Sequence, residues 1–168
     1  MFDKFFPDRY VASTYVIDFE GLYKEGVRGL IFDIDNTLVP HGAPADERAR
    51  ALFKRLKSIG FRCCLISNNQ KPRVEMFNKD IQVDYVYNAH KPSIRNYLKA
   101  MEIMGTDRDS TVFIGDQLFT DVYGANRAGI YGILVKPINP KEEIQIVLKR
   151  YLEAVVLHFY KREMQNKS

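Results

Sequence analysis

The chain has 168 residues, of which 46% are hydrophobic and 27% are charged, and its formal net charge is +4. These values fit one globular domain, and they exclude a disordered chain, a collagen-like chain and a disulfide-stapled miniprotein. The positive charge is not gathered into a polybasic block, so we expect no nucleic-acid partner. No run approaches 18 consecutive apolar residues, and residues 1–9 lack the pattern of a signal peptide. We therefore expect a cytoplasmic protein.

The central part of the chain alternates strand-like and helix-like segments. Strands are predicted at 29–35, 61–67, 84–87, 111–115 and 130–135, with helices at 44–59, 72–78, 92–105 and 119–128. Strands joined through helices form a parallel sheet with helices on both faces. We therefore predict a three-layer α/β/α, Rossmann-like fold in a single domain, with its core at 29–135 and flanking segments at 1–28 and 136–168.

The two cysteines, Cys63 and Cys64, are adjacent within a predicted strand. Neighbouring thiols cannot join distant parts of a fold. Free cysteine in a strand behaves as a small buried hydrophobe, which we prefer here to a redox pair.

Polar side chains follow the first predicted strand, where Asp33 and Asp35 are two residues apart. Ligands of open α/β sheets bind at the carboxyl ends of the strands. Two carboxylates at one such end repel each other unless a cation offsets their charge, and oxygen ligands favour Mg²⁺. The alternative is an ordinary surface turn, because Asp and Asn favour turns.

The next two strands are also followed by groups that can hold an anion. Ser67 and Asn68 offer a hydroxyl and an amide, although either residue fits an ordinary capping turn as well. Lys91 precedes Pro92, which we expect to open a helix, and a lysine there can hold a phosphate. A solvated lysine is the alternative. We treat His90 as incidental.

The strand at 111–115 is followed by two further acids, Asp116 and Asp121. Gly115 permits a close turn of the backbone there. Both carboxylates can point back toward the first strand, Asp116 from the loop and Asp121 from the first helical turn. Asp121 can instead cap that helix.

Together these residues resemble the four motifs of the haloacid dehalogenase (HAD) superfamily. The matching residues are Asp33, Asp35 and Thr37, then Ser67, then Lys91, then Gly115, Asp116 and Asp121. The segments around these residues are also similar to the YqeG-type branch of HAD subfamily IIIA, which is itself similar to phosphatidylglycerophosphate phosphatases.

The resemblance implies a phosphatase that forms an aspartyl-phosphate. Asp33 would be the nucleophile, and Asp35 would protonate the leaving oxygen and then deprotonate water. Ser67 and Lys91 would hold the phosphoryl oxygens. Thr37 would brace the loop that carries Asp33.

The resemblance also implies a Mg²⁺ cofactor. Asp33, the backbone carbonyl of Asp35, and Asp116 would bind the metal, and Asp121 would help to position it. Asn68 would add a donor for the phosphate. These are expectations from the family and not from the spacing alone.

The gaps between the motifs are filled by core elements, so we expect no cap domain. An open site suits a phosphate on a large substrate. The finer resemblance implies phosphatidylglycerophosphate, a lipid headgroup substrate in phospholipid synthesis. A soluble phosphatase acting on a protein, nucleotide or sugar phosphate is the alternative, and an interaction module that kept only the fold is a third.

The last segment has apolar residues at helical spacing over 141–162, with basic residues among them. We favour a helix that packs on the sheet or on a second copy of the chain. The alternative is an interfacial helix that holds the protein at the inner face of a membrane.

Overall fold

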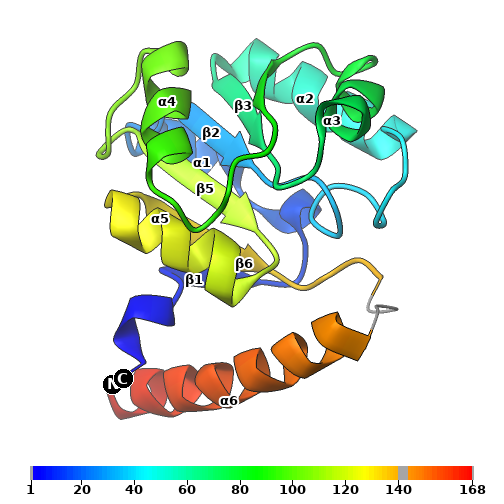
Figure 1. Cartoon of the computed structure of the whole chain (residues 1–168). Helices are drawn as coiled ribbons and strands as arrows, with labels where there is room; N and C mark the ends of the chain where they lie inside the picture. The colour runs from blue at the N-terminus through cyan, green and yellow to red at the C-terminus, as the bar shows by residue number, and fades with distance from the viewer. Residues whose placement is uncertain (1, 140–143, 168) are drawn as a thin grey trace.

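The computed structural model describes residues 2–139 and 144–167, and the side chains of the last helix from Leu148 onward. Six strands form one parallel sheet in the order β1-β6-β5-β2-β3-β4 (Figure 1). The strands are β1 (Arg9–Val11), β2 (Gly29–Phe32), β3 (Arg62–Ile66), β4 (Asp84–Val86), β5 (Thr111–Gly115) and β6 (Tyr131–Val135). The chain order reverses between β2 and β5, so the carboxyl ends of these two strands are adjacent.

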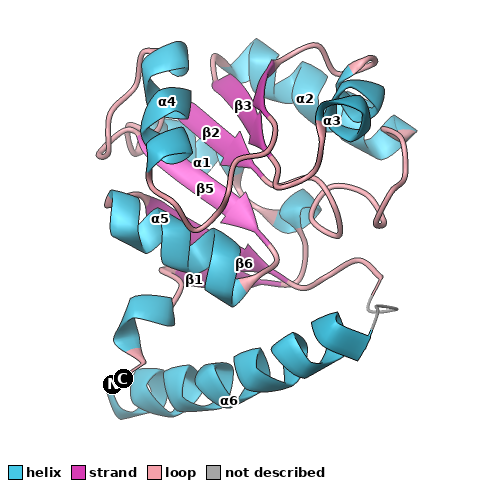
Figure 2. Cartoon of the chain, in the orientation of Figure 1, coloured by secondary structure: helices cyan, strands magenta, loops and turns pink. Residues whose placement is uncertain are grey.

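Helices cover both faces of the sheet (Figure 2). One face packs against α1 (Phe19–Lys24), α2 (Glu47–Ile59) and α3 (Lys71–Asn78). The other packs against α4 (Arg95–Met104) and α5 (Tyr123–Ala128). Successive strand residues point to opposite faces, so Leu30 lies in the first core and Ile31 in the second. The predicted three-layer α/β/α fold is confirmed.

The two cysteines divide between the same two cores. Cys63 packs in the first and Cys64 in the second, and both thiols are free. The interpretation as small buried hydrophobes is confirmed.

Two predicted helix starts were wrong. The helix predicted from residue 44 begins at Glu47, because the Asp46 carboxylate accepts a hydrogen bond from the Ala49 amide and so caps the helix there. Pro92 does not open α4, which begins at Arg95. The predicted end of the first helix was correct, since Gly60 adopts a left-handed conformation with φ of 119°.

The sheet also includes a strand from the segment that we placed outside the core. β1 pairs with β6, and α1 packs on the first face. Three-residue strands carry little periodicity, so β1 left no clear signal in the sequence.

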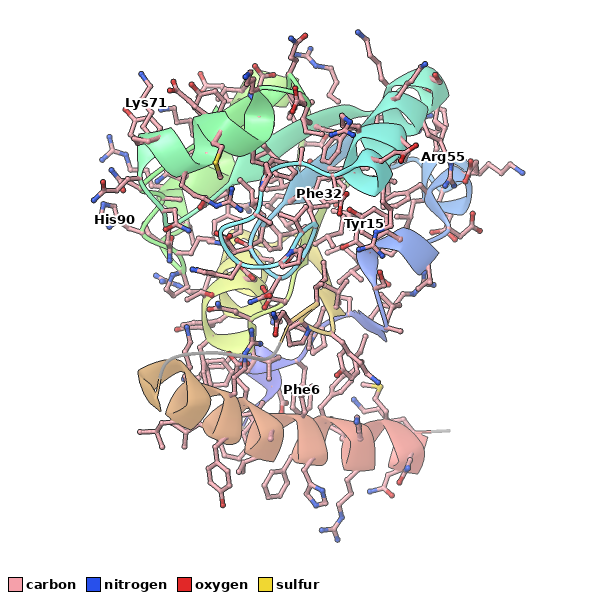
Figure 3. The ribbon with its side chains drawn as sticks, turned by 90° about the vertical axis from the view of Figure 1, so that its right-hand side faces the viewer. Phe6, Tyr15, Phe32, Arg55, Lys71 and His90 are labelled. Carbon is pink, nitrogen blue, oxygen red and sulfur yellow. The ribbon has the colours of Figure 1, made fainter. Side chains whose placement is uncertain are left out.

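The chain ends in a long helix, α6 (Ile144–Lys167), which runs past the edge of the sheet near β1 and η1 (Asp3–Phe5) (Figure 1). Its buried residues Glu153, Val156 and Tyr160 recur every three or four positions and define its inner face. Tyr160 meets the ring of Phe6 at 4.9 Å, and Figure 3 shows Phe6 beside this helix. The expectation that this helix packs on the core is confirmed for its inner face. None of the helices in the described chain is long and apolar enough to cross a membrane.

Candidate active site

The polar residues that follow β2, β3, β4 and β5 gather at one edge of the sheet, as the sequence predicts. The central pair is Lys91 and Asp33, whose Nζ and Oδ1 atoms are 2.8 Å apart. The same Nζ donates to Oδ1 of Asp121 at 2.6 Å. Lys91 is buried, so the interpretation as a solvated lysine was wrong. His90 is exposed.

Thr37 links the two carboxylates that end β2 and β5. Its hydroxyl lies 3.1 Å from Oδ2 of Asp33 and 3.2 Å from Oδ1 of Asp116. The hydroxyl thus orients one oxygen of each acid toward the other. The two aspartates and Asp121 each offer an oxygen within 4.8 Å of the others, and all three side chains are buried.

Burial and mutual repulsion set the protonation of this cluster. Burial, together with the charge of Asp121, raises the pKa of Asp33 well above its usual range. The same two causes raise the pKa of Asp116 to about 6, while Arg150 opposes the rise. Burial alone would lower the pKa of Lys91, but the charges of Asp121 and Asp33 raise it above its usual value. The three buried carboxylates of Asp33, Asp116 and Asp121 supply oxygen ligands of the kind that a hard divalent cation prefers.

Asp121 is fixed by the backbone as well as by Lys91. Its Oδ2 accepts the amide hydrogens of Asp116 and Gln117, each at 3.1 Å. It lies within a π-helical turn, Leu118–Val122, that leads into α5, so it does not cap that helix. A Cβ atom on Gly115 would lie 2.5 Å from Oδ2 of Asp121. Gly115 is therefore required by the close approach of this carboxylate.

Asp35 lies beside the cluster and is held by different partners. Its Oδ2 accepts from Asn69 at 2.7 Å, and its Oδ1 accepts from the guanidinium of Arg73 at 2.8 Å. The Gly42 amide donates to Oδ1 as well, at 2.8 Å. Neither Asn69 nor Arg73 was predicted as a site residue. The signal for Arg73 was its place in the first turn of the helix that follows a motif-bearing strand.

Ser67 and Asn68 have structural partners in the described chain. The Ser67 hydroxyl accepts from the Asn69 amide at 3.0 Å, and Oδ1 of Asn68 accepts from the Lys91 amide at 2.7 Å. Asn68 thus ties the loop that carries Lys91 to the end of β3. Their predicted contacts with phosphate stay predictions.

A residue far along the chain completes the cluster. Arg150, on α6, donates through Nη2 to Oδ2 of Asp116 at 2.5 Å and through Nη1 to the Asp116 carbonyl at 2.8 Å. Its neighbour Lys149 donates to the side chain of Gln117 at 2.9 Å. These contacts could not be predicted from local sequence patterns, because nothing in the sequence of the connection before α6 indicates where that helix will lie.

No separate cap domain is present among the described residues. Only α2 and β3 lie between Leu38 and Ser67, and only α3 and β4 lie between Ser67 and Lys91. The predicted absence of a cap is confirmed. The nucleophile candidate Asp33 is nevertheless only 8% exposed, although we expected an open site.

Comparison with known proteins agrees with this geometry. A family model described as HAD-hydrolase-like matches residues 88–137. The chain is 36% identical over 165 residues to a Bacillus subtilis (strain 168) protein named "Probable phosphatase YqeG", and the match covers 97% of this chain and 96% of that protein. It is 26% identical over 174 residues to phosphatidylglycerophosphate phosphatase 1 of Arabidopsis thaliana, covering 94% of this chain. The chain spans about half the length of that plant relative, 48%.

Solved structures share the fold. A HAD-superfamily subfamily IIIA hydrolase from Legionella pneumophila superposes with a TM-score of 0.54 at 20% sequence identity, covering 71% of each chain. The identity to the Bacillus protein extends over nearly the full length of both chains. The chain therefore belongs to the HAD-like hydrolases, as a phosphatase of the YqeG type.

Proposed function

We propose that this chain is a Mg²⁺-dependent phosphomonoesterase that removes the terminal phosphate of phosphatidylglycerophosphate through an aspartyl-phosphate on Asp33. The observation that carries the chemistry is the buried cluster of Asp33, Asp116 and Asp121 around Lys91. The lipid substrate is supported by the similarity to plant and algal phosphatidylglycerophosphate phosphatases.

In the first step an oxygen of Asp33 attacks phosphorus, and the bond from phosphorus to the glycerol oxygen breaks. Lys91 and Thr37 each hold one oxygen of Asp33, so the carboxylate is oriented before substrate arrives. Lys91 would also stabilise negative charge on the transferring phosphoryl group. Ser67 and Asn68 would add donors at the ends of the neighbouring loops.

Asp35 would supply the proton that the leaving glycerol oxygen needs. In the second step it would take a proton from the attacking water, and the bond from phosphorus to Asp33 would break to release inorganic phosphate. Both oxygens of Asp35 are now occupied by donors from Arg73, Asn69 and Gly42. At least one of these bonds must be exchanged when Asp35 acts on a leaving group.

The carboxylates of Asp33 and Asp116 and the backbone carbonyl of Asp35 would hold the Mg²⁺, with Asp121 positioning the loop. When bound, the cation favours the ionised form of Asp33 and neutralises charge on the phosphoryl group.

The outer face of α6 supports action at an anionic lipid surface. Its outer stripe consists of Leu148, Tyr151, Leu152, Val155 and Phe159, each at least 40% exposed. His158, Lys161 and Arg162 are exposed on the same helix, while Glu153 is buried on the inner face and the partly exposed Glu163 is paired with Lys167. An exposed apolar stripe on a helix with exposed cations complements an anionic bilayer.

The test measures phosphate release from phosphatidylglycerophosphate in mixed micelles, with Mg²⁺ or with EDTA, beside an aryl phosphate and a panel of soluble phosphates. We expect Mg²⁺-dependent release from the lipid, faster than from any soluble substrate. Asp33→Asn should reduce that release on the order of 10⁴-fold or more, because an amide is a poor nucleophile. A preference for a soluble phosphate would refute the lipid substrate and keep the chemistry. Binding of a protein partner without turnover of any substrate would refute both.

A further inference from the structure

Arg150 joins α6 to the acidic cluster of the site. Its guanidinium bridges two atoms of one residue, Oδ2 and the carbonyl oxygen of Asp116. The side chain of Arg150 is 20% exposed and that of Asp116 is fully buried. One bond reaches the buried carboxylate and the other reaches the backbone of the same residue, so the guanidinium fixes the side chain of Asp116 relative to its own backbone.

The two carboxylate oxygens of Asp116 have different hydrogen-bond partners. Oδ2 is taken by Arg150, whereas Oδ1 meets the Thr37 hydroxyl, which also meets Asp33. Arg150 thus binds Oδ2 and leaves Oδ1 on the side of Thr37 and Asp33. The contact does not block the oxygen that faces the acidic cluster.

Arg150 is itself held in place from within α6. Glu153 lies one turn further along the inner face, is 4% exposed, and accepts from Nη1 of Arg150 at 3.3 Å. Val156 follows on the same face and packs against Leu118 and Leu134. The guanidinium therefore donates to two buried carboxylates, those of Asp116 and Glu153, and apolar contacts hold its helix against the core.

From this geometry we infer that Arg150 is a positioning residue, which presents Asp116 to the divalent cation and couples the docking of α6 to metal binding. This inference rests on the metal requirement of the proposed function. Partners that hold a metal ligand in place typically contribute about 10–100-fold to metal affinity. Because coupling is reciprocal, the bound cation should also protect α6 from opening.

The experiment titrates Mg²⁺ into the purified full-length protein by isothermal titration calorimetry. We expect Arg150→Met to weaken Mg²⁺ binding about 10–100-fold. Arg150→Lys, which keeps the charge but not the two-point contact, should recover part of the loss. If the guanidinium merely competed with the cation for Asp116, Arg150→Met would instead strengthen binding, since a positive charge is removed.

Two control variants separate positioning from charge and from packing. Lys149→Met removes a neighbouring cation that contacts Gln117, and Val156→Ala loosens α6 without touching Asp116. Lys149→Met should bind Mg²⁺ within about threefold of the wild type, well short of the expected loss. Val156→Ala keeps Arg150, so it should weaken Mg²⁺ binding less than Arg150→Met does, by the part that loosened docking alone contributes. Equal weakening in Val156→Ala and Arg150→Met would overturn the positioning role.

Hydrogen exchange gives a readout that does not depend on turnover. Mg²⁺ should slow amide exchange along α6 in the wild type, and Arg150→Met should abolish this protection. Wild-type protein that binds Mg²⁺ with no change in α6 would refute the coupling and leave the proposed function standing. Wild-type protein that binds no Mg²⁺ would refute the metal requirement and the coupling together.

Discussion

Asp35 accepts hydrogen bonds at both carboxylate oxygens, yet the proposed chemistry needs it to carry a proton to the leaving group. We predict that Asp35→Asn slows hydrolysis of an alkyl phosphate about 10²–10⁴-fold. The same substitution should slow the hydrolysis of 4-nitrophenyl phosphate much less, because nitrophenolate leaves without protonation. Steady-state rates on the two substrates test this prediction.

A suitable control for the Asp35 variant is Asp80→Asn, which alters an exposed aspartate after α3. It should leave both rates unchanged. Equal losses on the two substrates for Asp35→Asn would show that Asp35 serves to bind or to fold and not as the general acid.

The thiols of Cys63 and Cys64 should be inert in the folded protein. Burial raises the pKa of each to about 12, so at pH 8 roughly one thiol in 10⁴ is ionised. Ellman's reagent should label them only after unfolding in guanidinium. Because the folded state keeps the protons that the unfolded chain loses first, stability should fall as the pH rises above about 9. Rapid labelling of native protein at pH 8 would contradict the burial of both thiols.

At the scale of elements, the turn between β5 and α5 depends on a glycine. We predict that Gly115→Ala displaces the Asp121 carboxylate, because the added Cβ atom would lie 2.5 Å from its Oδ2. Overpacking of this kind costs about 1–3 kcal/mol, and it would also break the contact between Asp121 and Lys91.

Guanidinium unfolding and Mg²⁺ titration together check the Gly115 prediction, with Gly105→Ala as the comparison. Gly105, at the end of α4, has an open space where its Cβ would lie, although its φ of 67° adds local strain. Gly105→Ala should therefore destabilise the fold without altering the Mg²⁺ affinity. A Gly115→Ala protein with wild-type Mg²⁺ affinity would show that the turn can yield without moving Asp121.

The elements of the core could be predicted from the sequence because each carries its own signal. Apolar runs mark β2 and β5, and Gly60 and Gly105 end helices in left-handed conformations. Helix starts were predicted less well, since the Asp46 cap competes with Pro44 as a start signal. The site residues at strand ends followed from topology, because parallel strands bring their carboxyl ends to one edge.

The residues that the sequence analysis missed reach the site through packing. Arg73 lies on α3, whose position follows from its connection to β3, so its contact with Asp35 could in principle have been predicted from the sequence. Arg150 lies on α6, whose docking depends on apolar contacts with Leu118 and Leu134 and on no local motif. Contacts between elements so distant in sequence are not encoded in the pattern of either element.

For the whole molecule, the two faces of α6 have different tasks. The inner face holds Arg150 against the site, and the outer face carries the exposed apolar stripe, with His158 and Arg162 exposed on the same helix. Arg150, which bonds Asp116, lies on the same helix between Leu148 and Leu152 of the stripe. We propose that the protein docks through α6, so that lipid phosphates reach the site without leaving the membrane surface.

The docking prediction is tested by flotation with vesicles of anionic or of neutral lipid. The wild type should float with anionic vesicles, and added salt should weaken its binding because cations contribute about 1 kcal/mol each. Changing both Leu148 and Leu152 to Ser should lower the affinity at least 10-fold, since each buried leucine contributes about 1.5–3 kcal/mol. Leu98→Ser, at an exposed leucine of α4, should float like the wild type. If the wild type instead forms a dimer that the double variant disrupts, and neither protein floats, the stripe joins two copies of the chain and the membrane docking is refuted.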